Sequence, residues 1–117
     1  MIEALLLAVT RVTTMLGEKT LTNATGFFFE RDRRLYLITS RHVVLDKPSE
    51  HYPDRLEIEL HVDPENVADT VGFSIPLYRE GKSLWLEGFD SAGPVDVVAL
   101  ELERAVLPKT LWFQAFT

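Results

Sequence analysis

Two apolar segments, Gly26-Phe27-Phe28-Phe29 and Leu35-Tyr36-Leu37-Ile38-Thr39, decide the fold of this chain. They flank the charged residues 30–34, which suit a solvated turn, so the pattern predicts a β-hairpin. Further along, Leu56-Glu57-Ile58-Glu59-Leu60-His61-Val62 alternates strictly between apolar and polar side chains, which predicts a strand with one face in water. These segments indicate an antiparallel all-β fold.

The remaining segments extend this pattern. Residues 2–9 place apolar groups at a helical period, which predicts a short N-terminal helix. Pro76 has no N–H to donate, so its strand is predicted at the edge of a sheet. About six or seven short strands at this spacing predict a single antiparallel β-barrel, closed or nearly closed. Beyond the hairpin and residues 56–62, the strands are expected at residues 9–14, 71–77, 84–86 and 95–102, the last of them buried, with turns at 63–66 and 91–94.

Size and composition limit the class of protein. The 117 residues fit one domain, residues 1–117, and no stretch approaches the roughly 20 apolar residues that span a bilayer. The net charge of −6 argues against nucleic acid as a partner, because phosphate binding needs clustered Lys and Arg. The chain has no cysteine, which excludes disulfides and cysteine-based zinc sites and favours a bacterial cytoplasmic location. We expect no membrane association and no cofactor.

A histidine and an aspartate stand at the ends of apolar strands, in Ile38-Thr39-Ser40-Arg41-His42-Val43-Val44 and Val95-Asp96-Val97-Val98-Ala99-Leu100. Histidine suits proton transfer because its ordinary pKa, roughly 6.5, lies near working pH. A carboxylate beside it would fix its tautomer and stabilise the imidazolium. His42 and Asp96 are therefore the candidate catalytic residues.

Together with Ala24-Thr25-Gly26-Phe27-Phe28, these segments resemble, in order, the N-terminal half of a trypsin-like serine peptidase of the bacterial HtrA-like branch. The resemblance implies the N-terminal barrel of that fold, with His42 as general base and later general acid and Asp96 orienting it. The serine and the oxyanion hole would come from a C-terminal barrel absent from this chain, so the chain alone is expected to be inactive. The full-length peptidase that the resemblance implies would hydrolyse peptide bonds of peptide or protein substrates.

One segment imitates the missing nucleophile loop. Phe89-Asp90-Ser91-Ala92-Gly93-Pro94 looks like that loop, but Phe89 stands where a glycine is needed and Ser91 precedes Asp96. We interpret it as a turn. Two other hypotheses remain open: a non-catalytic peptidase-like β-barrel module that binds protein partners, and an unrelated small β-barrel. A Gly-Asn/Asp-Ser-Gly sequence downstream of Thr117 would favour the enzyme over the module.

The other candidate site residues have simpler interpretations. His51 lies in a polar stretch and His61 on the wet strand face, so both are expected at the surface. A metal site on Glu57, Glu59 and His61 lacks a second cluster to complete it, so no metal is expected. The apolar tail, residues 107–117, is expected to fold back over the face that the missing barrel vacates, or to pair two chains there as a dimer.

Overall fold

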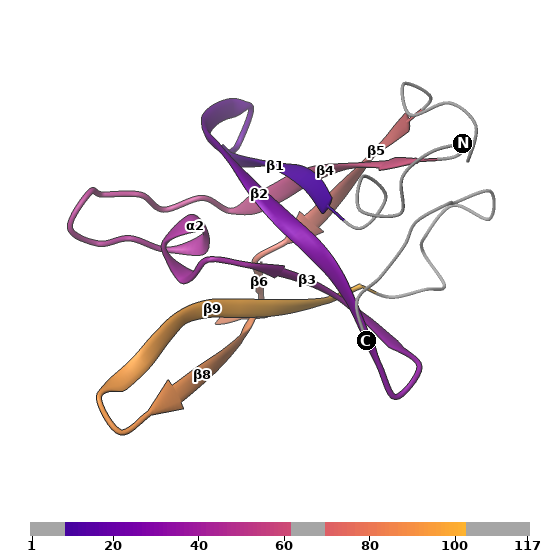
Figure 1. Ribbon diagram of the computed structural model, residues 1–117. Helices are drawn as coiled ribbons and strands as arrows, with labels where there is room; N and C mark the ends of the chain where they lie inside the picture. Colours follow the sequence, from indigo (N-terminus) through magenta and orange to yellow (C-terminus); the bar gives the residue numbers. More distant parts are fainter. Residues whose placement is uncertain (1–8, 62–69, 103–117) are drawn as a thin grey trace.

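The computed structural model describes residues 9–61 and 70–102, and most of these lie in antiparallel β-strands (Figure 1). The all-β prediction is confirmed. Apart from Val9, which opens the first strand, the predicted N-terminal helix lies outside the described residues, as do the turn at 63–66 and the tail. The elements are β1 (Val9–Leu16), β2 (Lys19–Arg31), β3 (Arg34–Thr39), the single-turn helix α2 (Arg41–Val44), β4 (Arg55–His61), β5 (Thr70–Pro76), β6 (Tyr78–Arg79), β7 (Lys82–Ser83), β8 (Leu86–Asp90) and β9 (Gly93–Leu102).

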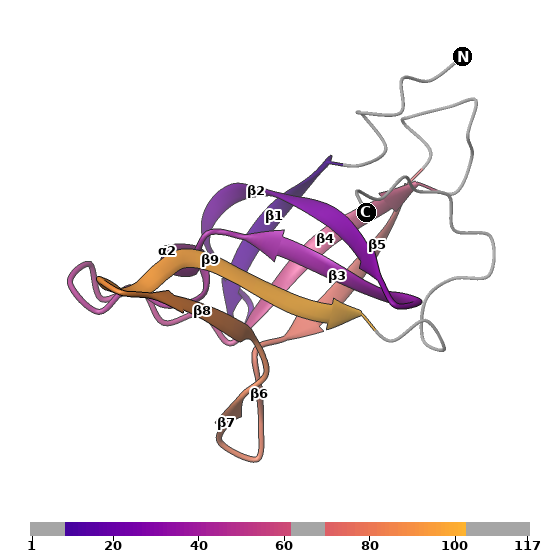
Figure 2. The ribbon, with the colours of Figure 1, turned by 60° about the horizontal axis from the view of Figure 1, so that its bottom comes forward.

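Seven of these strands form one sheet in the order β5-β4-β1-β2-β3-β9-β8, and β6 pairs with β7 separately. The sheet curls strongly, so that β9 and β5 come to lie across the interior from each other (Figure 2). A cavity of about 410 Å³ lies between them, lined by residues of both strands. Among the described residues, β5 and β8 are the sheet's two ends, so the closed barrel expected from the sequence is not confirmed.

The β2–β3 hairpin confirms the first prediction, with a tighter turn than the charged stretch suggests. Arg31 pairs with Arg34, which leaves only Asp32 and Arg33 in the loop. Both have positive φ, 53° and 67°, as a two-residue turn that follows the twist of its strands requires. The remaining charged residues of the stretch extend the two strands.

The core follows the two-residue period of the strands. On β4 the apolar residues Leu56, Ile58 and Leu60 are buried, as their alternation predicts. On β9 the prediction of a wholly buried strand is wrong, because Val97 is 49% exposed. One face of β9 packs inward and the other meets solvent. The buried apolar side chains are Val12, Phe28, Leu35, Leu37, Val43, Val44, Leu56, Ile58, Leu60, Ile75, Leu77, Trp85, Val98, Leu100 and Leu102.

Two predictions at the end of the sheet have different outcomes. The strand containing Pro76 is at the edge, as predicted. The strand predicted at residues 84–86 is wrong: the Leu84 N–H donates to the Leu77 carbonyl, at 2.9 Å, and so closes the loop that carries β6 and β7. Trp85 then enters the core, and Leu86 begins β8.

Candidate functional site

The site begins where β3 ends. Thr39 is buried and its Oγ1 donates to the Thr25 carbonyl oxygen, at 3.0 Å. This bond ties the two segments that carry the sequence motif. Ser40 is extended and the chain then makes the single turn α2, in which Val43 and Val44 are buried in the core. Because these two valines fix the inner side of the turn, the preceding residue, His42, is held at the surface.

Asp96 comes from β9, the neighbour of β3. Thr39 pairs with Val98, so Asp96 extends past the end of β3 toward α2. His42 Nδ1 lies 2.9 Å from Asp96 Oδ2, and the backbone N–H of His42 donates to Asp96 Oδ1 at 3.1 Å. The structure thus brings together the two predicted site residues at hydrogen-bonding distance, through both oxygens of the carboxylate.

This geometry fixes the chemistry of the imidazole. A carboxylate accepts, so the neutral ring carries its proton on Nδ1 and keeps the lone pair on Nε2. None of the hydrogen bonds within residues 9–61 and 70–102 involves that Nε2. Both side chains are 62% exposed, so the ring is open to solvent. Such a pair can take a proton at Nε2 and return it.

The pKa of the Asp96 carboxyl is lowered, chiefly by its hydrogen bond with the His42 side chain. The backbone N–H of His42 is the second cause, and desolvation opposes both. Each of these two hydrogen bonds is stronger when the carboxylate is charged, so the ionised form is favoured. Asp96 is therefore negatively charged at neutral pH, as an imidazolium partner needs.

We expect His42→Ala to raise the pKa of Asp96 toward its ordinary value, because the largest cause of the lowering is removed. Carbon NMR of the Asp96 carboxyl group during an acid titration measures this. Asp96 has a lower pKa in the folded state than in the unfolded state. Ionised Asp96 therefore stabilises the fold above its unfolded-state pKa, and this stabilisation is lost as the pH falls through the folded-state pKa. The difference in unfolding free energy between wild type and Asp96→Asn should therefore be full above pH about 4 and shrink below it. The control His61→Ala should leave the titration midpoint of Asp96 unchanged. A midpoint that is also unchanged in His42→Ala would contradict the observed pairing.

The other histidines, and Ser91 of the segment that looks like a nucleophile loop, lie apart from the His42–Asp96 pair. His51 is half-buried rather than free at the surface, and its Nε2 donates to the Val43 carbonyl at 2.9 Å. Its backbone also pairs with Asp46 and closes the loop after α2, so the residue is structural. Ser91 lies exposed in the turn between β8 and β9, as interpreted from the sequence.

The expectation of no metal concerned three residues of β4. The side chain of His61 lies outside what is described, and Glu57 accepts from Arg55 Nε and from Ser74 Oγ, each at 2.7 Å. In residues 9–61 and 70–102 no group of three metal-binding side chains gathers. Glu57 therefore has structural hydrogen-bond partners, and the bond from Ser74 joins β4 to β5.

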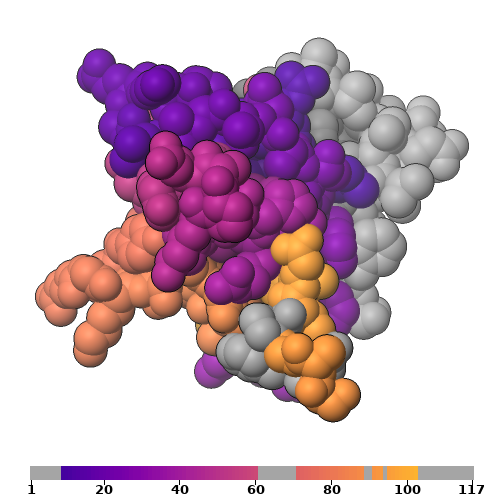
Figure 3. Space-filling view, turned by 90° about the vertical axis from the view of Figure 1, so that its left-hand side faces the viewer, coloured from indigo at the N-terminus to yellow at the C-terminus, as the bar shows by residue number. Residues whose placement is uncertain are grey.

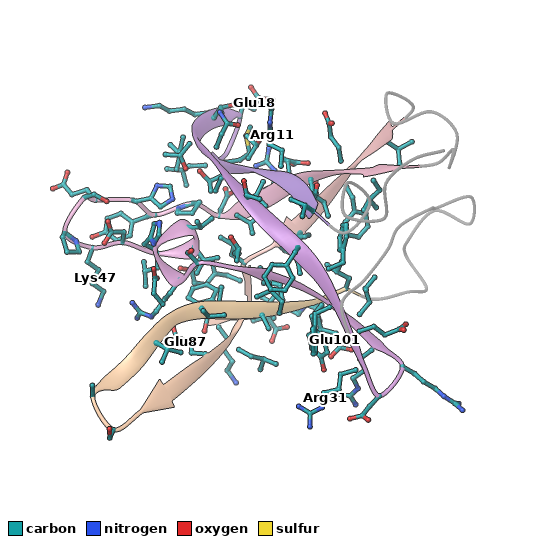
Figure 4. All side chains as sticks on the ribbon, in the orientation of Figure 1. Arg11, Glu18, Arg31, Lys47, Glu87 and Glu101 are labelled. Carbon is teal, nitrogen blue, oxygen red and sulfur yellow. The ribbon has the colours of Figure 1, made fainter. Side chains whose placement is uncertain are left out.

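Three further residues, which were not predicted from the sequence, adjoin the site. Arg41, directly before His42, places its Nε 3.0 Å from Glu87 Oε1. Trp85 Nε1 donates to the same oxygen at 2.8 Å. Glu87 projects from β8 near α2 (Figure 4). Arg41 and Glu87 are 46 positions apart, and no local pattern in the sequence links them.

An open hollow of about 500 Å³ lies beside the histidine. Figure 3 shows this face, with α2 and the loop after it between the β1–β2 hairpin and β9. The hollow therefore borders the imidazole ring. Its walls are Leu21, Thr22, Asn23, Ala24, His42, Val43, Asp46, Ser49, Glu50 and His51.

No family model, no curated protein and no solved structure matches this chain. Within the part of the chain that the structure describes, no helix is long and apolar enough to cross a bilayer.

Proposed function

We propose that this chain is the N-terminal part of a trypsin-like serine peptidase and supplies the histidine and aspartate of its Ser-His-Asp triad. The observation that carries the proposal is the two-point contact of Asp96 with the side chain and the backbone N–H of His42. A carboxylate that merely caps a turn needs only the backbone contact. Here the second oxygen also holds Nδ1, which orients Nε2 as a base.

The reaction assigns each group one task. Nε2 of His42 takes the proton of the serine hydroxyl while that oxygen attacks the scissile carbonyl carbon, and Asp96 stabilises the imidazolium. The imidazolium then gives this proton to the leaving amine nitrogen as the C–N bond breaks. Water repeats the sequence on the acyl-enzyme, which releases the carboxylic acid and restores the serine.

The serine and the oxyanion hole come from a second domain, joined after Thr117 or supplied by a partner chain. The exposure of the His42–Asp96 pair supports this, because a peptidase needs a water-poor site and a docked domain would cover the pair. The cysteine-free sequence supports a reducing compartment, the bacterial cytoplasm.

A fluorophosphonate probe, which reacts only with an activated serine, tests the proposal. We expect the probe to label the longer protein or assembly that contains the second domain, and not the chain of residues 1–117 alone. His42→Ala should abolish the labelling, because the serine loses its base, whereas the control His61→Ala should retain it. Labelling that survives His42→Ala would contradict the assigned role of His42.

A non-catalytic module that binds a protein partner is the second candidate function. The exposed apolar residues Leu86 and Val97 favour it, because Leu86 pairs with Ala99 and so shares a face of the β8–β9 hairpin with Val97. A wild-type longer protein that the probe does not label, but that still binds partners through this hairpin, would support the module. The dimer expected from the sequence would instead pair two copies of this chain through the face that the missing barrel vacates.

A further inference from the structure

The turn that carries His42 has little structure of its own. Helix α2 is a single turn, closed by the Val43 N–H on the Ser40 carbonyl at 3.1 Å and by the Leu45 N–H on the Arg41 carbonyl at 3.2 Å. A helix this short is not stable by itself, so tertiary contacts decide its orientation. The contacts on its outer side therefore determine where the imidazole points.

Two neighbouring strands hold consecutive residues of this turn. Asp96 of β9 holds His42, and Glu87 of β8 holds Arg41. Glu87 pairs with Val98, two residues along β9 from Asp96, so the two carboxylates lie on the same face of one hairpin. Two anchors on adjacent residues fix both the position and the rotation of the turn, which one anchor cannot do.

Glu87 is itself fixed. Its Oε1 accepts from both the Arg41 guanidinium and the indole N–H of Trp85, whose ring is buried in the core. The side chains of Arg41 and Glu87 are only 36% and 24% exposed. A partly buried pair with a third, rigid partner is worth more than a surface ion pair, whose two long side chains must lose their freedom.

We propose that Glu87 is a positioning residue for His42, acting through Arg41 to keep the imidazole aligned on Asp96. This inference rests on the proposed function for its purpose, since a base must be aligned before it can act. The alignment itself is a property of the chain alone. It can therefore be measured without substrate or serine.

The tautomer of His42 reports the alignment. Nδ1 carries the proton while the ring is held on Asp96, whereas a free histidine side chain favours the proton on Nε2. Long-range ¹H–¹⁵N correlations of the ring, recorded at pH about 8.5 where an ordinary histidine is neutral, give the ratio of the two forms. We expect Glu87→Ala to raise the Nε2–H to Nδ1–H ratio about twofold or more, the lower end of the coupling within one hydrogen-bond network.

Other variants separate positioning from general stability. Arg41→Met should raise the ratio in the same way and leaves Glu87 to accept from Trp85, so it carries the test if Glu87→Ala does not fold. Glu87→Gln keeps an acceptor oxygen and should raise the ratio less than Glu87→Ala. The matched control is Glu57→Ala, which removes a carboxylate with the same kind of arginine contact on β4 and should leave the ratio unchanged.

A wild-type ratio in Arg41→Met, or in a folded Glu87→Ala, would overturn the proposal. An equal shift in Glu57→Ala would also overturn it, because the effect would then be general loosening. The outcome is independent of the proposed function: a protein that the fluorophosphonate probe does not label can still show the shift, and a labelled one can lack it.

Discussion

Asp96→Asn is expected to lower kcat for peptide hydrolysis by about four orders of magnitude in the proposed peptidase that contains this chain. Asparagine can turn its N–H₂ toward Nδ1, which moves the ring proton to Nε2 and blocks the nitrogen that must accept the serine proton. Steady-state kinetics on a peptide ester or amide measures the loss. KM should change much less, because Asp96 lies behind His42 and is not expected to touch the substrate.

The matched control is Asp32→Asn, at the tip of the β2–β3 hairpin, where φ is 53° and asparagine is well tolerated. It should retain wild-type kcat. His42→Ala should cost at least as much as Asp96→Asn, and the double variant should lose little more, since the two residues act as one unit. Near-normal turnover in Asp96→Asn would show that the pair is structural.

Gly26→Ala is expected to destabilise the fold by about 1–3 kcal/mol, the range for overpacking a filled site. A Cβ on Gly26 would lie 3.0 Å from the Ile38 carbonyl oxygen, 2.9 Å from Leu37 Cδ1 and 3.2 Å from Val12 Cγ2. The side chains can yield, but the carbonyl belongs to the backbone of β3 and moves only with the strand. Urea unfolding measures the change.

Gly72→Ala is the control for this effect, because a Cβ there meets nothing within 4 Å. It should be neutral or slightly stabilising, since alanine restricts the unfolded chain more than glycine does. Equal stability of the two alanine variants would contradict the tight packing of β2 on β3. Because β3 leads directly into α2, the Gly26 variant should also disturb the contact between His42 and Asp96.

The strands with a clear local pattern could be predicted from the sequence. Alternation alone places Leu56, Ile58 and Leu60 on the inner face, and two apolar runs around a charged stretch suffice for the β2–β3 hairpin. The strand predicted at residues 84–86 is wrong because a backbone hydrogen bond from Leu84 to Leu77 decides the local structure. This hydrogen bond closes a short loop, and the alternation of apolar and polar residues does not mark it.

The closure of the sheet could not be predicted either. It depends on whether the two end strands of the sheet, β5 and β8, pair with each other, and in the part of the chain that the structure describes they do not. The sequence pattern indicates where most strands lie, but the curl of a sheet depends on its twist and on side-chain volumes. The open sheet order is therefore a finding of the structure.

The candidate site was predictable in one part only. The pairing of His42 with Asp96 was expected from the resemblance of two short motifs to those of trypsin-like peptidases, and the structure brings the two side chains together. Glu87 was missed because a glutamate in a polar stretch is usually a solvated side chain, and its contact with Arg41 arises only when β8 folds beside β9. The motifs therefore predicted His42 and Asp96, whereas the contact of Glu87 with Arg41 depends on the order of the strands in the sheet.

The distance along the chain between His42 and Asp96, 54 positions, has a consequence for how the site arises during folding. The cost in chain entropy of closing such a loop grows only slowly with length, by about 0.6 kcal/mol per doubling, but no local contact repays it in advance. β9 must dock on β3 before the carboxylate meets the imidazole. A chain emerging from the ribosome therefore carries His42 through the synthesis of five further strands, β4 to β8, before Asp96 exists, and the contact between the two residues forms only after β9 has been made.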